Sequence, residues 1–474
     1  MIERDKAVIN FIEIIQNKDN KYKLATTIPD LYIDAKFGML DNGNYELSFD
    51  LTPKDKERGI NPDYFLTRPF TLFTPWQRIM IQNYDVVGLT HSLLEKPSQK
   101  YSVEVKAFNG GIEDSFWTQT RQTAYIKFDP QLYPPYKFGV TFNKSFRNEN
   151  SENAIFLNIA DTDILLYYEL IEKNKGYLII WPKGKIGYTN FRAIIDSVII
   201  SLGLLSGFYL EESIYIFAQR GQGINNIACR YENISQAFNT NSPIIPKKNY
   251  DGIPEEKLGL TNENFNELVK LLYNNEEYKR SAKLLINAGK ETGCAKAALG
   301  AVALETITNV ICKNLPTKVI IDNKQTIGAI RNNLRKTLKE FKERISSSQF
   351  SLLKGNIDRV NNAPNANKYI EAFDLLGIEV DEDELYCLKC RNLFLHGKLP
   401  ELKKYIAFSQ DELLDIVSNR LVMLSAMLLL KKAGYQGYVL DNGMTQVVKW
   451  RMIRNGEITK SGNCLREIIK SKEE

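Results

Sequence analysis

Apolar and polar residues alternate through the first half of the chain with the two-residue period of a β-strand that buries one face. The clearest alternating stretches are residues 33–37 and 45–49, and the Asp-Asn-Gly sequence at 41–43 between them is typical of a tight hairpin turn. Further strands are expected at 101–107, 124–128, 138–142, 214–217 and 227–231, with central strands at 155–159, 164–168 and 177–181. A helix at 191–205, capped by Asn190, is expected to pack on the sheet. Residues 1–240 therefore predict a β-rich domain, either a meander-like sheet or a sandwich.

The pattern changes after residue 240. Residues 241–259 are rich in Asn, Lys and Pro, which is typical of a linker. Beyond them the apolar period is helical, and helices are expected at 262–273, 276–288, 291–313, 323–345, 350–361, 365–376, 381–397 and 409–432. The last of these begins with a capping box from Ser409 to Glu412. Its stretch 421–430 is apolar all round, as in the centre of a bundle or at a dimer contact.

The last part of the chain, residues 434–474, contains a second Asp-Asn-Gly sequence at 441–443, between the stretches 438–440 and 445–450. It is expected to form a hairpin, followed by a short charged helix. The fold class predicted for the 474 residues is α+β: a β-rich domain, a linker, an all-helical bundle over 260–433 and a hairpin tail.

The composition argues against a secreted or membrane protein. The chain is 43% hydrophobic and 25% charged, as is usual for soluble globular proteins. Its first residues are charged and lack the layout of a signal peptide. The longest apolar runs, 197–210 and 421–430, are shorter than the roughly 20 residues that span a bilayer. We therefore expect a cytoplasmic protein that does not enter a membrane.

Neither a metal nor a cofactor is expected. Six cysteines in so long a chain are not a disulfide framework. Cys387 and Cys390 have the C-x-x-C spacing, but no second Cys or His pair completes a zinc site, so core cysteines are the better interpretation. No phosphate-binding G-x-x-x-x-G-K-S/T sequence and no complete dinucleotide fingerprint occur.

Candidate chemistry lies in residues 390–397, which read Cys-Arg-Asn-Leu-Phe-Leu-His-Gly. At about 100° per residue, Lys389, Asn392 and His396 form one polar stripe on an otherwise apolar helix. Asn392 and His396 are spaced i,i+4, so the amide can orient the imidazole. Arg391 ends in a planar fork that suits phosphate. The other histidine, His91, has no carboxylate or cysteine at ligand spacing and is taken as a structural or surface residue.

These groups match the needs of metal-independent RNA cleavage. The 2′-hydroxyl attacks its own 3′-phosphate and the 5′-oxygen of the next nucleotide leaves, which gives a 2′,3′-cyclic phosphate and a 5′-hydroxyl; the reaction needs a base, an acid and a cation on the phosphorane. The structural alternative is a buried His396 bonded to Asn392, with Arg391 paired to Glu384 or to another helix.

The Arg-Asn-x-x-x-His core of residues 391–396, followed by Gly397, resembles the signature of the HEPN superfamily (higher eukaryotes and prokaryotes nucleotide-binding). The resemblance covers 260–433 in architecture and 390–397 in motif. It implies an endoribonuclease that cuts single-stranded RNA, with tRNA among the candidates, and a homodimer in which two such helices form one cleft. It also implies proton transfer by His396, phosphate stabilisation by Arg391, and orientation of the imidazole or substrate contact by Asn392.

The order of the domains resembles the ApeA-type anti-phage proteins of bacteria. This resemblance implies a toxin of abortive infection that cuts host RNA. The N-terminal domain would then sense a phage-derived trigger or restrain the nuclease.

Other residues are weaker candidates. Glu305 and Asn309, spaced i,i+4 in an apolar stretch, could line the cleft or make satisfied packing contacts. The predicted helix 323–345 carries an excess of cations, which form a solvated face or an RNA-backbone track; the candidates are Arg331, Arg335, Lys339 and Lys342. The net charge of +5 is compatible with RNA as a partner.

Two other functions remain open. One is a HEPN module that binds nucleotides or proteins without cutting RNA. The other is RNA binding by the basic helix while the β-rich domain recognises a further partner. An RNA-cleavage assay without metal distinguishes the enzyme from these two alternatives, because only the enzyme cuts RNA and loses this activity when Arg391 or His396 is replaced.

Overall fold

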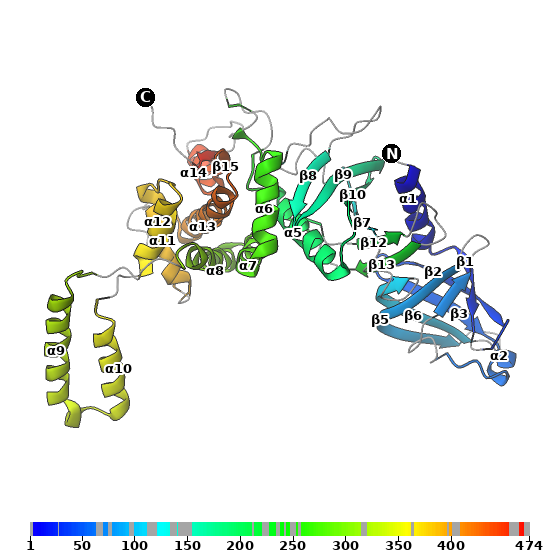
Figure 1. Ribbon diagram of the computed structural model, residues 1–474, viewed down its shortest axis with the longest axis horizontal. Coiled ribbons are helices and arrows are strands. Elements are labelled where there is room, and N and C mark those ends of the chain that lie inside the picture. The colour runs from blue at the N-terminus through cyan, green and yellow to red at the C-terminus, as the bar shows by residue number, and fades with distance from the viewer. Residues whose placement is uncertain are drawn as a thin grey trace.

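The computed structural model of the chain has an α+β fold, with strands in the N-terminal half and helices in the C-terminal half (Figure 1). The structure describes residues 3–26, 28–62, 70–73, 78–93, 99–110, 121–132, 140, 154–210, 213–219, 227–233, 238–240, 243–246, 253–254, 257–313, 320–361, 365–395, 398–400, 408–454 and 464–468. Its described strands form one twelve-stranded sheet and two small two-stranded sheets. The predicted fold class is thereby confirmed at the level of strands followed by helices.

The first six strands of the large sheet form a closed ring. They follow the order β3-β2-β1-β4-β5-β6, β3 also pairs with β6, and all these pairs are antiparallel. Buried aromatic residues such as Tyr22, Phe37 and Tyr45 pack together in this part. The strands are β1 (Lys21–Ala25), β2 (Tyr32–Met39), β3 (Tyr45–Leu51), β4 (Phe70–Phe73), β5 (Arg78–Leu93) and β6 (Gln99–Gly110), and the short helix α2 (Pro53–Glu57) follows β3.

Beyond the ring, the sheet continues in the order β13-β12-β7-β10-β9-β8. Helix α1 (Glu3–Gln16) packs on one face and helix α5 (Tyr188–Ser206) on the other. Because side chains alternate along a strand, Tyr125 lies in the core beside α1, whereas Ala124 and Ile126 lie in the core beside α5. The strands are β7 (Arg121–Phe128), β8 (Ala154–Ile159), β9 (Thr162–Glu172), β10 (Lys175–Pro182), β12 (Ser213–Gln219) and β13 (Ile227–Asn233).

Most of the predicted strands are confirmed. Strands β2 and β3 form the expected hairpin, in which Ala35 is paired with Phe49, and Gly43 in its turn has a φ of 82° that glycine adopts without strain. The other predicted strands lie within β6 to β10, β12 and β13, except that residues 138–142 lie outside the described residues apart from Val140. Helix α5 begins earlier than predicted, with Gly187 rather than Asn190 at its N-cap.

Helix α1 was not predicted, although Val8, Ile12 and Ile15 have helical spacing and are buried. It docks on the sheet through a buried carboxylate. Asp5 is fully buried and accepts hydrogen bonds from the hydroxyls of Tyr125 (2.8 Å) and Tyr167 (2.7 Å).

Helix α6 (Asn262–Asn274) covers the outer edge of the sheet. Asn262 Oδ1 accepts from the Phe156 N–H (2.9 Å), its Nδ2 donates to the Phe156 carbonyl (3.1 Å), and Asn266 Oδ1 accepts from the Asn158 N–H (2.8 Å). These side chains bond the backbone of β8 where another strand would pair, which protects the sheet edge. Strand β8 is thus an edge strand and not the predicted central one.

The C-terminal half contains the predicted bundle of helices. Helix α13 (Gln410–Lys432) is buried all round from Leu421 to Leu430 and begins with the predicted capping box. Small residues let α8 (Gly293–Ile311) approach it, since a Cβ on Gly300 would lie 3.3 Å from Val422 Cγ2. The other helices of the bundle are α6, α7 (Glu276–Ala288), α11 (Asn365–Leu375) and α12 (Glu382–Leu395), each within a few residues of its predicted range.

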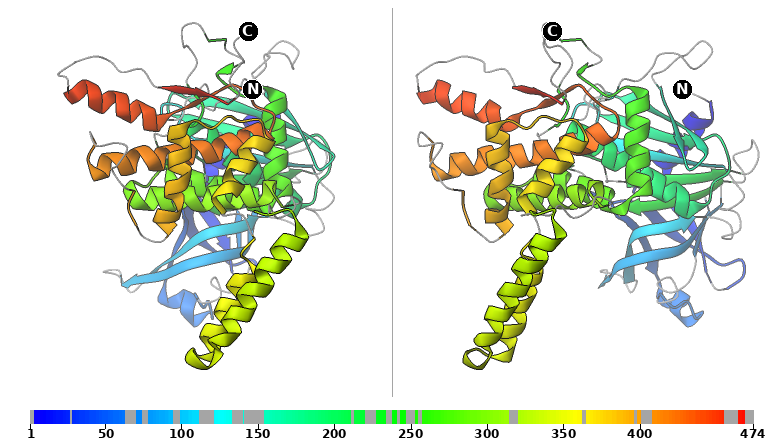
Figure 2. Two further views of the ribbon diagram at one scale, coloured as in Figure 1. Left: turned by 90° about the vertical axis from the view of Figure 1, so that its left-hand side faces the viewer. Right: turned by 60° about the vertical axis from the view of Figure 1, so that its left-hand side comes forward.

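The predicted helix 323–345 ends earlier than expected. Helix α9 (Lys324–Glu340) is followed by a 3-10 turn (Lys342–Arg344) and by helix α10 (Ser347–Asp358). The two helices form a hairpin that projects from the bundle (Figures 1 and 2). We call residues 320–361 the arm.

The tail differs from the prediction. Strand β15 (Tyr438–Leu440) pairs with β16 (Leu465–Glu467), and the predicted second strand lies within helix α14 (Asn442–Arg454). Asp441 Oδ1 accepts from the Met444 N–H (2.8 Å) and caps this helix. The same Asp-Asn-Gly sequence therefore forms a turn at 41–43 and a helix start at 441–443. A short charged helix was predicted at the end of the chain, where residues 469–474 lie outside the described residues.

In the described part of the chain, three helices, α5, α8 and α13, are long and apolar enough to cross a membrane by length and composition alone. In the fold they contribute many side chains to one core that extends from the sheet into the bundle. The cytoplasmic location of the chain stays a prediction.

Candidate functional site

The candidate site lies where three helices of the bundle meet. Helix α12 supplies Arg391 and Asn392, α8 supplies Glu305, and α11 supplies Tyr369. Acidic residues in the first turn of α12 interact favourably with the positive end of its dipole, and its apolar sides pack against α8, α11 and α13. Packing of α12 between these helices brings Arg391 to Glu305, 86 residues earlier in the chain.

Arg391 is the centre of this site. It is 4% exposed and pairs through Nη2 with Glu305 Oε2, while Nη1 donates to Asn392 Oδ1 at 2.6 Å. Its guanidinium lies over the Tyr369 ring, 4.7 Å from the ring centroid. Burial raises the pKa of the Tyr369 hydroxyl, an effect that Arg391 opposes, so the ring is neutral at physiological pH. Arg391 Nε is buried and has no hydrogen-bond partner among the described residues.

The open side of the site is polar. The Glu305 side chain is 43% exposed, and Lys389, Asn392 and Asn309 are all exposed. The structure thus brings Arg391, Asn392 and Glu305 into contact and leaves a wet face beside them. His396 directly follows Leu395, the last residue of α12, and lies outside the described residues.

The alternative pairing of Arg391 with Glu384 does not occur. Glu384 is bound instead by Arg466 of the tail, whose Nε donates to Glu384 Oε1 (2.7 Å) and whose Nη2 donates to Oε2 (3.2 Å). Arg391 does pair with another helix, through Glu305. Two important residues, Tyr369 and Arg466, were missed, because an aromatic residue on a helix and an arginine in a short strand carry no distinguishing sequence signal.

The basic candidates are on the arm, outside this contact. Arg331 Nη2 donates to the Asp358 carbonyl (2.9 Å), and Arg335 pairs with the Asp358 carboxylate (2.5 Å). These two arginines therefore join α9 to α10. Lys339 and Lys342 are exposed. His91 lies in β5, opposite Tyr101 of β6.

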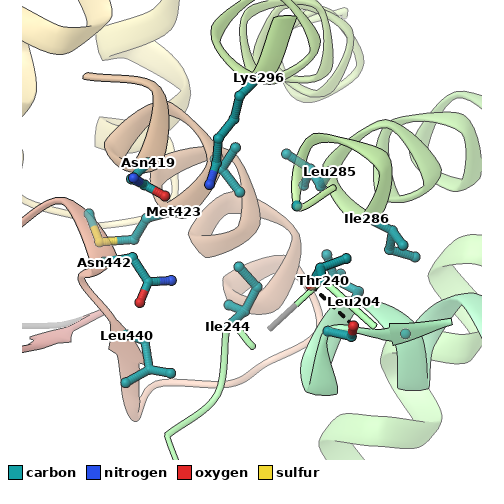
Figure 3. A pocket seen from close by; sticks show the side chains of 14 residues that line it. Leu204, Thr240, Ile244, Leu285, Ile286, Lys296, Asn419, Met423, Leu440 and Asn442 are labelled. Carbon is teal, nitrogen blue, oxygen red and sulfur yellow. Dashed lines mark hydrogen bonds between the residues drawn. The ribbon is translucent and has the colours of Figure 1, made fainter. Parts of the chain in front are cut away.

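A small cavity lies where the end of α5, the bundle and the tail meet (Figure 3). Lys296 of α8 extends into it, facing Asn419 and Met423 of α13 and Asn442 of the tail. Its volume of about 20 Å³ is enough for one water molecule. Burial lowers the pKa of Lys296, and Asp415 partly offsets this. The cavity can hydrate a buried ammonium group and is too small for a metabolite.

The wall of this cavity includes part of the predicted linker. Ile244 and Ile245 are buried, and their N–H groups donate to the Leu205 carbonyl at 3.1 and 3.2 Å. The Leu440 N–H of the tail donates to the Ile244 carbonyl at 2.8 Å. This segment is therefore packed between the end of α5 and the tail.

The cysteines are free thiols, as expected for a chain without a disulfide framework. Cys229, Cys312, Cys387 and Cys390 are buried, whereas Cys294 is exposed. Burial raises the pKa of Cys387 and of Cys390, which disfavours the thiolate. Among the described residues, no group of three or more His, Cys, Asp or Glu side chains is placed to hold a metal ion.

Comparisons of this chain with protein-family models, with curated proteins and with solved structures give no match.

Proposed function

We propose that this protein is a metal-independent endoribonuclease of the HEPN type. The observation that carries the proposal is the contact of Arg391 with Glu305: a guanidinium that is 4% exposed pairs with a carboxylate whose side chain is 43% exposed, beside the exposed residues Lys389 and Asn392. A guanidinium whose carboxylate partner can turn into solvent can exchange that partner for a phosphate.

Each residue of the site has a role in the proposed reaction. Arg391 binds the scissile phosphate and stabilises the negative charge of the phosphorane. His396, which follows α12, transfers a proton to or from the reacting oxygens. Asn392, bonded to Arg391, orients the guanidinium or contacts the RNA. Since the attacking group is the 2′-hydroxyl of the RNA itself, DNA is inert.

Glu305 opposes this chemistry in the folded chain. Its carboxylate occupies the side of the guanidinium that a phosphate needs, so RNA binding requires exchange of one anion for another. Glu305 is 43% exposed and can turn towards solvent without becoming a buried unpaired charge.

The remaining parts of the proposal come from the family resemblance. Two copies pair through the helical domain to form a shared cleft, and the exposed residues Val302 and Asn309 of α8, with the half-buried Glu305 between them, are available to that contact. The enzyme acts in the cytoplasm on single-stranded RNA such as tRNA, in anti-phage defence, with a trigger recognised by the N-terminal half.

The test is cleavage of total RNA by the purified chain in EDTA. Wild-type protein should cut RNA to 2′,3′-cyclic phosphate ends, and Arg391→Ala and His396→Ala should each lose at least 100-fold of this activity. Matched controls are Arg280→Ala, an exposed arginine on α7, and His91→Ala, the other histidine. Retention of cleavage in both site variants would refute the proposal.

The second candidate is a module that binds RNA or protein without cutting. The Arg391–Glu305 pair favours it too, because this pair satisfies part of the guanidinium within one chain. Absence of cleavage, with RNA binding unchanged in His396→Ala, would support this candidate over the enzyme.

A further inference from the structure

The arm carries the whole net charge of the chain. Residues 320–361 contain nine Lys and Arg against four Asp and Glu, a net charge of +5. The chain has 62 Lys and Arg against 57 Asp and Glu, so the other residues carry 53 charges of each sign. The residues outside the arm therefore carry no net charge, and the arm alone accounts for the net charge of +5.

The arm is almost entirely exposed. In α9 the one buried residue is Ile327, and α10 has none. The arm leaves the bundle and extends away from the sheet, the bundle and the tail, which is clear in Figure 1 and in the right view of Figure 2. The arm is long and buries few side chains, so its own contacts contribute little to the stability of the fold. We therefore look for a role of its charged surface in binding another molecule.

Its base is fastened and lies close in sequence to the candidate site. The Ile320 N–H donates to the Asn361 carbonyl (2.9 Å), and the Asn361 side chain bonds both the N–H and the carbonyl of Ile321 (2.8 and 3.0 Å). The arm is inserted between α8, which supplies Glu305, and α11, which supplies Tyr369. Both helices that contact Arg391 therefore lead directly into the arm.

Five of the nine cations of the arm form two groups. Arg331 and Arg335 are bonded to Asp358 and hold the hairpin together. Lys336, Lys339 and Lys342 are exposed and have no carboxylate within ion-pair distance among the described residues. The second group is free to neutralise an external polyanion, whereas contacts of Arg331 and Arg335 with RNA stay a prediction.

We infer that the arm binds the phosphate backbone of RNA and holds the substrate beside the Arg391 site; the identity of the polyanion as RNA rests on the proposed function. Helix α9 is about 25 Å long, enough to follow several successive phosphates. The arm also exposes apolar side chains, among them Leu334, Phe341 and Leu352, but self-association through the arms would bring two surfaces of charge +5 together. The contacts are electrostatic, so they give affinity without sequence preference.

The test uses full-length protein with the Arg391→Ala change, so that RNA is bound and not cut. The arm variant is Lys336→Gln, Lys339→Gln and Lys342→Gln, which removes three charges and keeps good helix formers. The matched control is Lys18→Gln, Lys54→Gln and Lys173→Gln, three exposed lysines of the N-terminal half. Binding of a fluorescent single-stranded RNA is measured between 50 and 300 mM salt, about the range over which phosphate contacts weaken.

The arm variant should bind RNA about 10- to 100-fold more weakly at physiological salt, and its log–log salt slope should fall by about 2. The control triple should behave like the parent. Equal binding by arm variant and control overturns the inference, whatever the cleavage assay shows. RNA binding that depends on the arm in a chain that never cuts RNA upholds the inference and refutes the nuclease.

Two other occupants of the arm are outcomes of the same experiment. Anionic phosphatidylglycerol vesicles that bind the parent in preference to RNA, and lose binding in the arm variant, would replace RNA by a membrane surface. A change of oligomeric state in the arm variant, without a change in RNA affinity, would replace it by a second copy of the chain.

Discussion

Replacement of Arg466 by methionine should release the tail from helix α12. Arg466 and Glu384 form a two-point ion pair, and their side chains are 9% and 1% exposed. Methionine fills similar space without a charge, so the variant keeps a buried carboxylate at Glu384. The N–H of Asp381, at 3.0 Å, then remains as its donor among the described residues.

The magnitude follows from the burial of the carboxylate that is left. Removing one partner of a buried ion pair costs about 3–5 kcal/mol, because the other charge is uncompensated. A side chain that is 1% exposed cannot recover solvation by a small movement, so the upper part of that range applies. Since about 1.4 kcal/mol is tenfold, the opening equilibrium of the tail should rise by about three to almost four orders of magnitude.

Hydrogen exchange of peptides from β16 and the first half of α12 measures this opening locally, which suits a chain of several parts. The matched control is Lys257→Met, which removes a 2.8 Å pair with Glu467 in the same tail. The Lys257 side chain is 45% exposed, so its loss should cost under about 1 kcal/mol. Equal protection in the two variants would refute the reasoning.

The same variant has a defined pH dependence. A buried carboxyl without a cation has its pKa raised above the unfolded value, and such a group destabilises the fold above its raised pKa. The deficit of Arg466→Met should therefore shrink as the pH falls from 8 to 5. The double variant with Glu384→Gln has no carboxyl to protonate at this position, and its deficit should be smaller and independent of pH.

Three further predictions concern other buried or paired groups. Glu305→Gln should raise RNA affinity several-fold by freeing Arg391, and should lower the free energy of unfolding by about 1–3 kcal/mol, less than the loss of a fully buried pair. Binding isotherms measure the affinity and thermal melting measures the stability. Weaker RNA binding would contradict the exchange of Glu305 for a phosphate. Maleimide at pH 8 should label the exposed Cys294 quickly and the buried cysteines slowly, because burial and a raised pKa keep the buried side chains as thiols. Mass spectrometry of peptides measures the labelling rates. Fast labelling of Cys387 would contradict its interpretation as a core cysteine. Asp5→Ala should cost about 2–4 kcal/mol by leaving two buried tyrosine hydroxyls without this acceptor, seen as faster exchange in α1; unchanged protection would show that the hydroxyls find other partners.

Sequence predicted the local elements well, because their signals are local. The capping box at Ser409 and the alternation around Gly43 depend on neighbouring residues, and both occur as predicted. The second Asp-Asn-Gly sequence shows the limit of this reasoning, since Asp441 caps a helix and the partner strand of β15 is 25 residues away in sequence. A turn motif indicates which backbone conformation the residues can adopt without strain, and the tertiary contacts determine whether the chain adopts it.

Long-range pairings could not be predicted. The sequences of β3 and β6 do not indicate that these strands pair and close the ring, because both are ordinary alternating strands. The site shows the same limit. Glu305 and Arg391 were each chosen for their unusual polarity, but their contact requires α8 and α12 to pack together. The separation of the arm cations into bonded and unbonded groups also depends on where α10 places Asp358.

Helix α12 is held at both ends by ion pairs to different parts of the chain. Glu384 in its first turn is bound by Arg466 of the tail, and Arg391, seven residues later, is bound by Glu305 of α8. Seven residues span about 10 Å along the helix, so the two ends belong to one rigid rod. A movement of the tail therefore displaces the guanidinium that the proposed reaction uses.

The tail in turn is bonded to the N-terminal half. The Leu440 N–H donates to Ile244, and the Ile244 N–H donates to Leu205 at the end of α5, which packs on the sheet. If the N-terminal half restrains the nuclease, this continuous path through linker and tail transmits the restraint to α12, with no need for the sheet to touch the site. Arg466→Met cuts the path between tail and helix. It should then change RNA cleavage as well as stability, whereas unchanged cleavage in a folded Arg466→Met protein would exclude the tail from regulation.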